Sequence, residues 1–168
     1  MSFYLRALNN KLRWYKSSNP SWLLPNEIPV HPLADLLPKL GDHSLSLWHI
    51  DPDRSNLKRV AAAITAGRNT VDKFDYVLFP EELIGSCGVS IIQIPGETPD
   101  DHSNEHWHWD VIELTADKLV RLATEMYVKG EVARILPEVI RQLILQGIES
   151  RQLQEGKISQ NLLGELRS

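Results

Sequence analysis

The residue types best suited to chemistry are gathered in one short run, His106-Trp107-His108-Trp109-Asp110. In an extended strand, alternate side chains point to opposite faces of the sheet, so His106, His108 and Asp110 would share one face and the indoles the other. Imidazole nitrogen and carboxylate oxygen are ligands for zinc, iron or manganese, and three protein ligands leave a position open for water or substrate. The spacing therefore predicts a site for one divalent transition metal.

The H-x-H-x-D spacing resembles a fragment found in several families of metal-dependent hydrolases. Their fuller pattern has another His directly after the Asp, where this chain has Val111, so the resemblance is confined to five residues. It implies a hydrolase in which the two imidazoles and the carboxylate hold the ion while His49 or Glu105 transfers a proton. The alternative is a half-buried strand without a cofactor, whose indoles pack inward and whose polar residues face water.

Two further segments carry reactive side chains, one around His49 and Asp51 and the other at Cys87. His49 stands near the end of an apolar run and Asp51 lies in the turn that follows, where open-sheet proteins often have their sites, which makes His49 a candidate general base. Asp51 is equally suited to a turn or a helix cap. Cys87 precedes an apolar strand and fits a small packed hydrophobic residue better than a nucleophile. Neither common glycine-rich phosphate-binding spacing occurs, which argues against nucleotide binding.

The charges are unevenly distributed along the chain. The net charge is -4, yet residues 1–16 carry four basic residues and no acid, whereas residues 72–113 carry ten acids against one lysine. A polarised surface of this kind suits a charged protein partner or self-association. The overall excess of acid makes nucleic acid an unlikely partner, despite the basic and aromatic mixture at the start of the chain.

Composition places the chain among globular proteins. It has 168 residues, of which 42% are hydrophobic and 24% charged, enough for one continuous core. The longest apolar runs are far shorter than the ~20 residues of a membrane-spanning helix, so no membrane partner is expected. One cysteine excludes an intramolecular disulfide, and the first residues lack the pattern of a secretion signal, so we expect a cytoplasmic protein.

The hydrophobic patterns predict a single α+β domain over residues 1–168, with a central sheet of about four to six strands, one or two packed helices and a helical C-terminal third. Strands are indicated at residues 44–50, 74–79, 89–94 and 106–114, and a helix follows the first of them. The expected parts are a hairpin or helix at 1–16, a proline-rich wrap with a short helix at 33–37 within 17–43, the sheet core at 44–114 and the helical region at 115–168.

The helical region has two expected members. Thr115 is a plausible N-cap for the first, and the second carries apolar residues from Val132 to Ile148, with a kink at Pro137 unless it begins near Leu136. Its apolar stripe is wide enough for a dimer interface. With five tryptophans in the chain, the sequence favours a small protein-interaction or regulatory subunit, acting with a protein partner or as a homodimer. The expected contact residues are Trp107, Trp109, Ile140 and Ile144.

Overall fold

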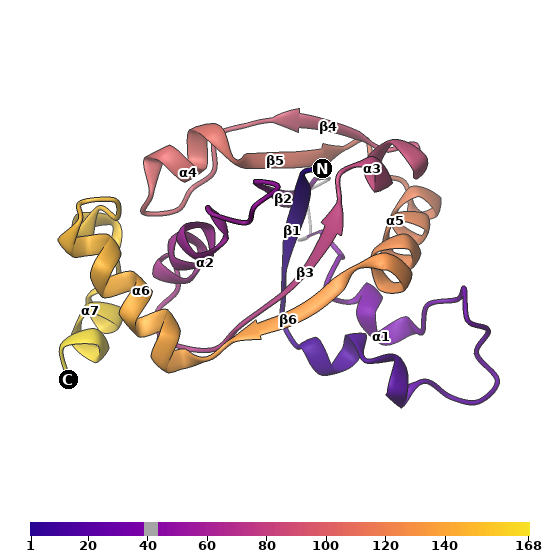
Figure 1. Cartoon of the computed structure of the whole chain (residues 1–168), viewed down its shortest axis with the longest axis horizontal. Coiled ribbons are helices and arrows are strands. Elements are labelled where there is room, and N and C mark those ends of the chain that lie inside the picture. The colour runs from indigo at the N-terminus through magenta and orange to yellow at the C-terminus, as the bar shows by residue number, and fades with distance from the viewer. Residues whose placement is uncertain (39–43) are drawn as a thin grey trace.

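The fold is built around one antiparallel sheet with the strand order β4-β5-β2-β1-β3-β6, seen in a computed structural model that describes residues 1–38 and 44–168 (Figure 1). The α+β class is confirmed, and so is a C-terminal third that is largely helical. The strands are β1 (Phe3–Leu8), β2 (Leu45–Ile50), β3 (Phe74–Pro80), β4 (Ser90–Gln93), β5 (His108–Ile112) and β6 (Glu131–Ile135).

Helices cover both faces of the sheet (Figure 1). One face packs against α2, α6 and α7, and the other against α1, α3 and α5, so β3 is buried along residues 74–79. The helices are α1 (Val30–Leu33), α2 (Leu57–Ala66), α3 (Glu82–Ser86), α4 (Asp101–His106), α5 (Ala116–Lys129), α6 (Pro137–Glu149) and α7 (Gln160–Arg167), with short 3-10 helices at Lys11–Trp14, Lys16–Ser18 and Glu155–Lys157. None of these helices is long and apolar enough to cross a bilayer.

The first sixteen residues form neither a hairpin nor an α-helix, so that expectation was wrong. β1 pairs with β2 and β3 and lies in the middle of the sheet. After Asn10 the chain turns into a 3-10 helix, because the Asn10 side chain accepts a hydrogen bond from the Leu12 amide and Asp75 accepts one from the Lys11 amide. The conformation of residues 3–8 therefore depends on pairing with two strands that come later in the chain. The alternation of apolar and polar residues within the segment could not reveal that pairing.

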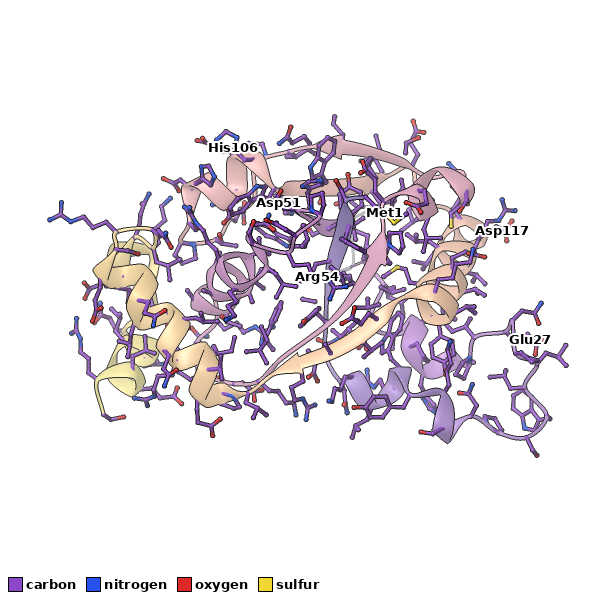
Figure 2. The ribbon with its side chains drawn as sticks, in the orientation of Figure 1. Met1, Glu27, Asp51, Arg54, His106 and Asp117 are labelled. Atoms are coloured by element: carbon purple, nitrogen blue, oxygen red, sulfur yellow. The ribbon has the colours of Figure 1, made fainter. Side chains whose placement is uncertain are left out.

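The proline-rich segment lies partly against the body and partly away from it. Its helix, α1, begins at Val30 and ends at Leu33, earlier than the expected 33–37. Residues around Glu27 project to one side of the molecule (Figures 1 and 2). The expectation that Trp22 and Leu24 pack against the body was wrong, since they are 74% and 58% exposed. Residues 39–43, which belong to the same expected segment, lie outside the described residues.

The C-terminal region contains one strand that the sequence did not reveal. Thr115 caps α5 as expected, its side chain accepting a hydrogen bond from the Lys118 amide. The chain then forms β6, which pairs with β3, and α6 begins only at Pro137. Proline suits this first helical position because its missing N–H would have no partner there. The apolar residues assigned to one long helix are thus divided between an edge strand and a helix.

Candidate functional site

The run from His106 to Asp110 is divided between a helix and a strand, which corrects the expected metal face. Asp100 caps α4 by accepting hydrogen bonds from the Ser103 amide and hydroxyl. The helix then continues to His106, and β5 begins at His108. Since pleating starts only at His108, it does not bring His106 onto the face that carries His108 and Asp110.

His108 and Asp110 do share a face, where both line a polar pocket. The His108 Nε2 lies 3.7 Å from Asp110 Oδ1, and its Nδ1 lies 2.7 Å from the Ile94 carbonyl oxygen. Arg6 and Glu97 line the same pocket, which has a volume of about 500 Å³. The Arg6 guanidinium donates to the Ser46 carbonyl, and burial lowers its pKa to about 10, against the opposing effect of Asp35 and Asp110.

This pocket is poorly suited to a metal ion. A guanidinium beside the Asp110 carboxylate supplies the positive charge that a cation would otherwise bring. Within residues 1–38 and 44–168, no three side chains of His, Cys, Asp or Glu come close enough to hold one ion. Among the described residues, the pocket lacks the three-ligand set that the hydrolase hypothesis needs.

His49 and Glu105, the expected proton-transfer residues, occupy separate places. The His49 ring packs edge-on against Tyr4, and its Nδ1 is 4.0 Å from Asp51 Oδ1. Glu105 is exposed on α4. Asn56 fixes the turn after β2 by accepting from the Asp51 amide and donating to the His49 carbonyl. Asp51 therefore has the turn-forming surroundings that were the alternative to a catalytic role.

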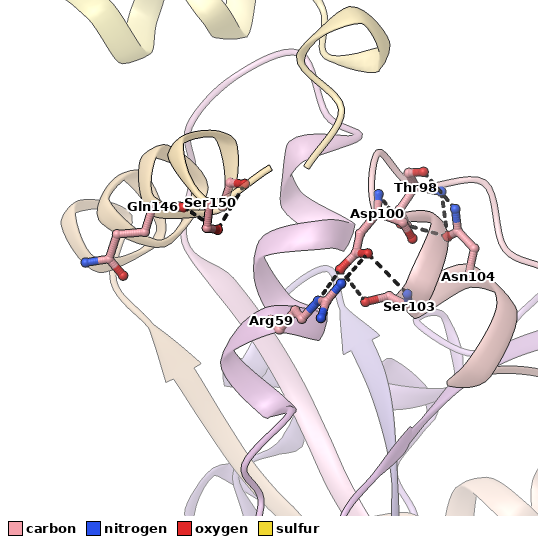
Figure 3. A network of polar contacts seen from close by, with 8 residues as sticks. Arg59, Thr98, Asp100, Ser103, Asn104, Gln146 and Ser150 are labelled. Atoms are coloured by element: carbon pink, nitrogen blue, oxygen red, sulfur yellow. Dashed lines mark hydrogen bonds and ion pairs between the residues drawn. The ribbon is translucent and has the colours of Figure 1, made fainter. Parts of the chain in front are cut away.

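A cleft of about 580 Å³ lies between α2 and α6, and Asp51 and Arg59 are among its lining residues. Arg59 also belongs to a polar network that the sequence did not single out (Figure 3). Asp100 is 1% exposed and receives two bonds from Arg59, at 2.6 Å and 2.9 Å. The Arg59 guanidinium also lies 5.5 Å from the centre of the Trp107 ring. Burial alone would raise the pKa of Asp100, but the bonds from Arg59 and Ser103 outweigh it and lower that pKa.

This network fastens α4 to α2, because Arg59 stands on α2 and Asp100 caps α4. The Arg59 and Asp100 side chains are thus committed to each other. The signal available in the sequence was Asp100 at a possible N-cap, followed by a second acid, Asp101, in the first turn.

The four expected contact residues are packed inside the chain to different degrees. Ile140 and Ile144 are 0% exposed, so the proposed dimer stripe on α6 was wrong. Helix α7, which the sequence pattern did not indicate, covers this stripe, and Arg141 holds it in place by donating to the Leu166 carbonyl. Trp107 and Trp109 are partly buried against the two core clusters, one on each face of the sheet.

Exposed apolar side chains instead gather near the N-terminus. Of the eleven large hydrophobic residues exposed in the described chain, five fall within residues 12–37. We call this set the N-terminal apolar surface: Leu12, Trp22, Leu24, Val30 and Leu37. A groove of about 640 Å³ runs beside it, and its lining contains no carboxylate: Leu12, Arg13, Asn19, Pro20, Trp22, Pro29, Val30 and His31.

The base of this surface is anchored to the body. Trp14 is buried, and its indole N–H donates to Asp35 at 2.9 Å, while the Arg13 guanidinium donates to the other oxygen of the same carboxylate. The Tyr127 hydroxyl of α5 donates to the Asn19 side chain at 2.6 Å. The exposed side chains thus project from a segment that is fixed at both ends of the groove.

Comparison with known proteins gives no relative: no family model, no curated protein sequence and no solved structure matches this chain.

Proposed function

We propose that this protein is a binding or regulatory subunit that captures an apolar, acidic segment of a partner protein along the N-terminal apolar surface, in the cytosol. The carrying observation is that three of the exposed residues of this surface, Leu12, Trp22 and Val30, line one groove. Clustered apolar exposure of this kind marks protein-interaction sites, whereas single exposed apolar residues are ordinary. The single thiol, Cys87, which is buried, suits a reducing compartment.

The energetic gain would come mainly from two side chains. Trp22 is 74% exposed and Val30 is 78% exposed, so both have most of their apolar area still available for burial. Full burial of a large apolar side chain contributes about 1.5–3 kcal/mol. Because hydrogen bonds from Trp14 and Tyr127 already hold the base of the segment, less conformational entropy is lost when a partner docks.

Charge selects among possible partner segments. The groove lining includes Arg13 and His31 and no acid, although the Arg13 guanidinium is paired with Asp35. Lys11, Lys16 and the acid Glu27 lie on the same stretch of chain, so basic residues remain in excess there. A carboxylate on the partner would meet favourable potential here, and a basic segment would meet repulsion. We therefore assign the occupant to peptides that combine large apolar residues with Asp or Glu.

The experiment is a selection from displayed random peptides on the immobilised full-length protein. We expect the enriched peptides to contain large apolar residues together with Asp or Glu. Their synthetic versions should bind at least about tenfold more weakly to a Trp22→Ser/Val30→Ser variant, which is a loss of about 1.4 kcal/mol. Replacing their acids with amides, or raising the salt concentration, should also weaken binding.

The matched control is Val120→Ser/Val139→Ser, which removes two apolar side chains that are 45% and 40% exposed on α5 and α6. Peptide binding should be unchanged in this variant. The proposal is wrong if no peptides are enriched, or if the enriched peptides bind both double variants equally. It is also wrong if the free protein dimerises through this surface, which sedimentation of the native and Trp22→Ser/Val30→Ser proteins would show.

A further inference from the structure

Helix α4 places two imidazoles side by side on the outside of the molecule. His102 and His106 are four residues apart, and their ring centres are 4.4 Å apart with a 52° angle between the planes. Both side chains are exposed, and Figure 2 shows His106 at the outer surface of α4. Residues at this spacing share one face of a helix and lie one above the other.

The backbone that carries these imidazoles is fixed at both ends. At the start of α4, Asp100 is held by Arg59 of α2. At its end, the Trp107 carbonyl accepts from the His49 amide at 2.7 Å, and the Gln93 side chain donates to the Glu105 and His106 carbonyls. A short helix with such anchors holds the two rings near each other without a large loss of entropy on binding a ligand.

The surroundings leave the ring nitrogens accessible. The Trp107 ring contacts the His102 ring edge-on, with centres 4.8 Å apart, and restricts its rotation. The nearby Asp101 carboxylate is occupied by Lys157 and Gln154. No carboxylate among the described residues forms an ion pair with either imidazole. A small cation can therefore approach both rings from solvent.

We propose that His102 and His106 together bind one divalent transition-metal ion, with water completing its coordination. Two imidazoles one helical turn apart can direct a nitrogen each toward the same ion, and imidazole ligands suit Cu²⁺, Ni²⁺ and Zn²⁺. Affinity should be highest for Cu²⁺. This site shares His106 with the metal face expected from the sequence, but its second ligand is one helical turn earlier in the chain. It uses none of the residues of the N-terminal apolar surface.

The test is calorimetric titration of untagged, full-length protein with Cu²⁺, Ni²⁺ and Zn²⁺. We expect one ion per chain. His102→Ala and His106→Ala should each weaken binding at least about tenfold, since even outer residues of metal sites cost 10–100-fold when changed. Native protein should also be retained on a nickel-chelate resin, and each variant should be released earlier. Circular dichroism without metal should be the same for all three proteins, because both rings are exposed.

His31→Ala is the matched control, since His31 is an exposed histidine remote in sequence from α4. Its metal affinity should equal that of the native protein. A second variant, His102→Gln, keeps a polar side chain at the position and should bind as weakly as His102→Ala. The absence of stoichiometric binding would overturn the proposal, and so would binding that survives in both single alanine variants.

Discussion

The buried carboxylates of residues 1–38 and 44–168 are each paired with a guanidinium. Three such carboxylates are at most 3% exposed. They form the ion pairs Asp75–Arg134, Asp100–Arg59 and Asp35–Arg13. Burial of an unpaired carboxylate would be strongly unfavourable, whereas a bidentate guanidinium replaces much of the lost hydration. At the scale of single residues, the polar interior is therefore sensitive to the loss of one partner.

Replacing Asp100 should destabilise the fold. Asp100→Ala removes the cap of α4 and leaves Arg59 without its carboxylate, and loss of one partner from a buried pair costs about 3 kcal/mol or more. Urea unfolding measures the effect. The neighbouring Asp101 pairs with Lys157 at the surface, so Asp101→Ala should cost less than about 1 kcal/mol. Equal losses in the two variants would contradict a structural role for the Arg59–Asp100 network.

Cys87 should be chemically inert in the folded protein. Its side chain is among the buried residues, and burial raises the pKa of the thiol, so the reactive thiolate is scarce. We expect a thiol reagent such as Ellman's reagent to react slowly with native protein and rapidly in denaturant. Fast reaction under native conditions, with the fold shown to be intact, would contradict the buried environment.

At the scale of elements, apolar runs and helix caps in the sequence identified the helices and strands whose conformation depends mainly on neighbouring residues. The apolar runs of β2 and β3 and the Thr115 cap of α5 were all found in the sequence. Segments decided by distant contacts were not found. β1 pairs with residues 43 to 77 positions later in the chain, and β6 extends the sheet only because β3 offers an edge.

The candidate site shows the same division. The sequence identified the histidine-rich segment, but it assigned His106 to a strand because Trp and His alternate there. A cap at Asp100 instead extends α4 through His106, so the imidazole that lies next to it is His102. The cluster of exposed apolar residues could not be predicted either. Trp, Leu and Val are usually buried, so their presence in this segment indicated burial, whereas the structure leaves these side chains exposed.

The junction between α5 and β6 should tolerate only glycine. A Cβ added at Gly130 would meet the Met126 carbonyl oxygen and lie 2.6 Å from Cγ2 of Val77. Overpacking of this kind costs about 1–3 kcal/mol, and we expect Gly130→Ala to lose stability within that range in urea unfolding. Gly156→Ala is the control, because no heavy atom lies within 4 Å of a Cβ there. A fully stable Gly130→Ala protein would show that the junction can relax.

At the scale of the whole molecule, the two outer strands of the sheet differ in how they meet solvent. β6 carries Glu131 and Arg134, both in ion pairs, whereas β4 has no charged residue. Charged side chains hinder the pairing of exposed edges between molecules. In the described chain, the β6 edge of the sheet is therefore better protected than the β4 edge against pairing with a strand of another molecule.

Stability of the whole fold should fall in acid. Burial would raise the pKa of Asp75 and of Asp100, but their hydrogen bonds and ion pairs outweigh it, so both values lie below the ordinary one. A carboxyl whose pKa is lower when folded stabilises the protein above its unfolded pKa of about 3.9, and this contribution is lost as the pH falls toward the folded value. Urea midpoints should therefore drop below about pH 5.

The control for this pH dependence is Asp75→Asn, which removes one of the two titrating groups. The variant should be less stable at neutral pH and should lose less further stability on acidification. A native protein whose unfolding free energy is the same at neutral and at strongly acid pH would contradict the assignment of these two carboxylates.

The central position of β1 has a consequence for biosynthesis. The strand is synthesised before its partners β2 and β3, which end at Ile50 and Pro80. Translation must therefore pass β3 before the middle of the sheet can close, and the buried side chains of Tyr4 and Leu5 stay uncovered until then. Nascent chains stalled before residue 80 should accordingly be better clients for chaperones than longer ones.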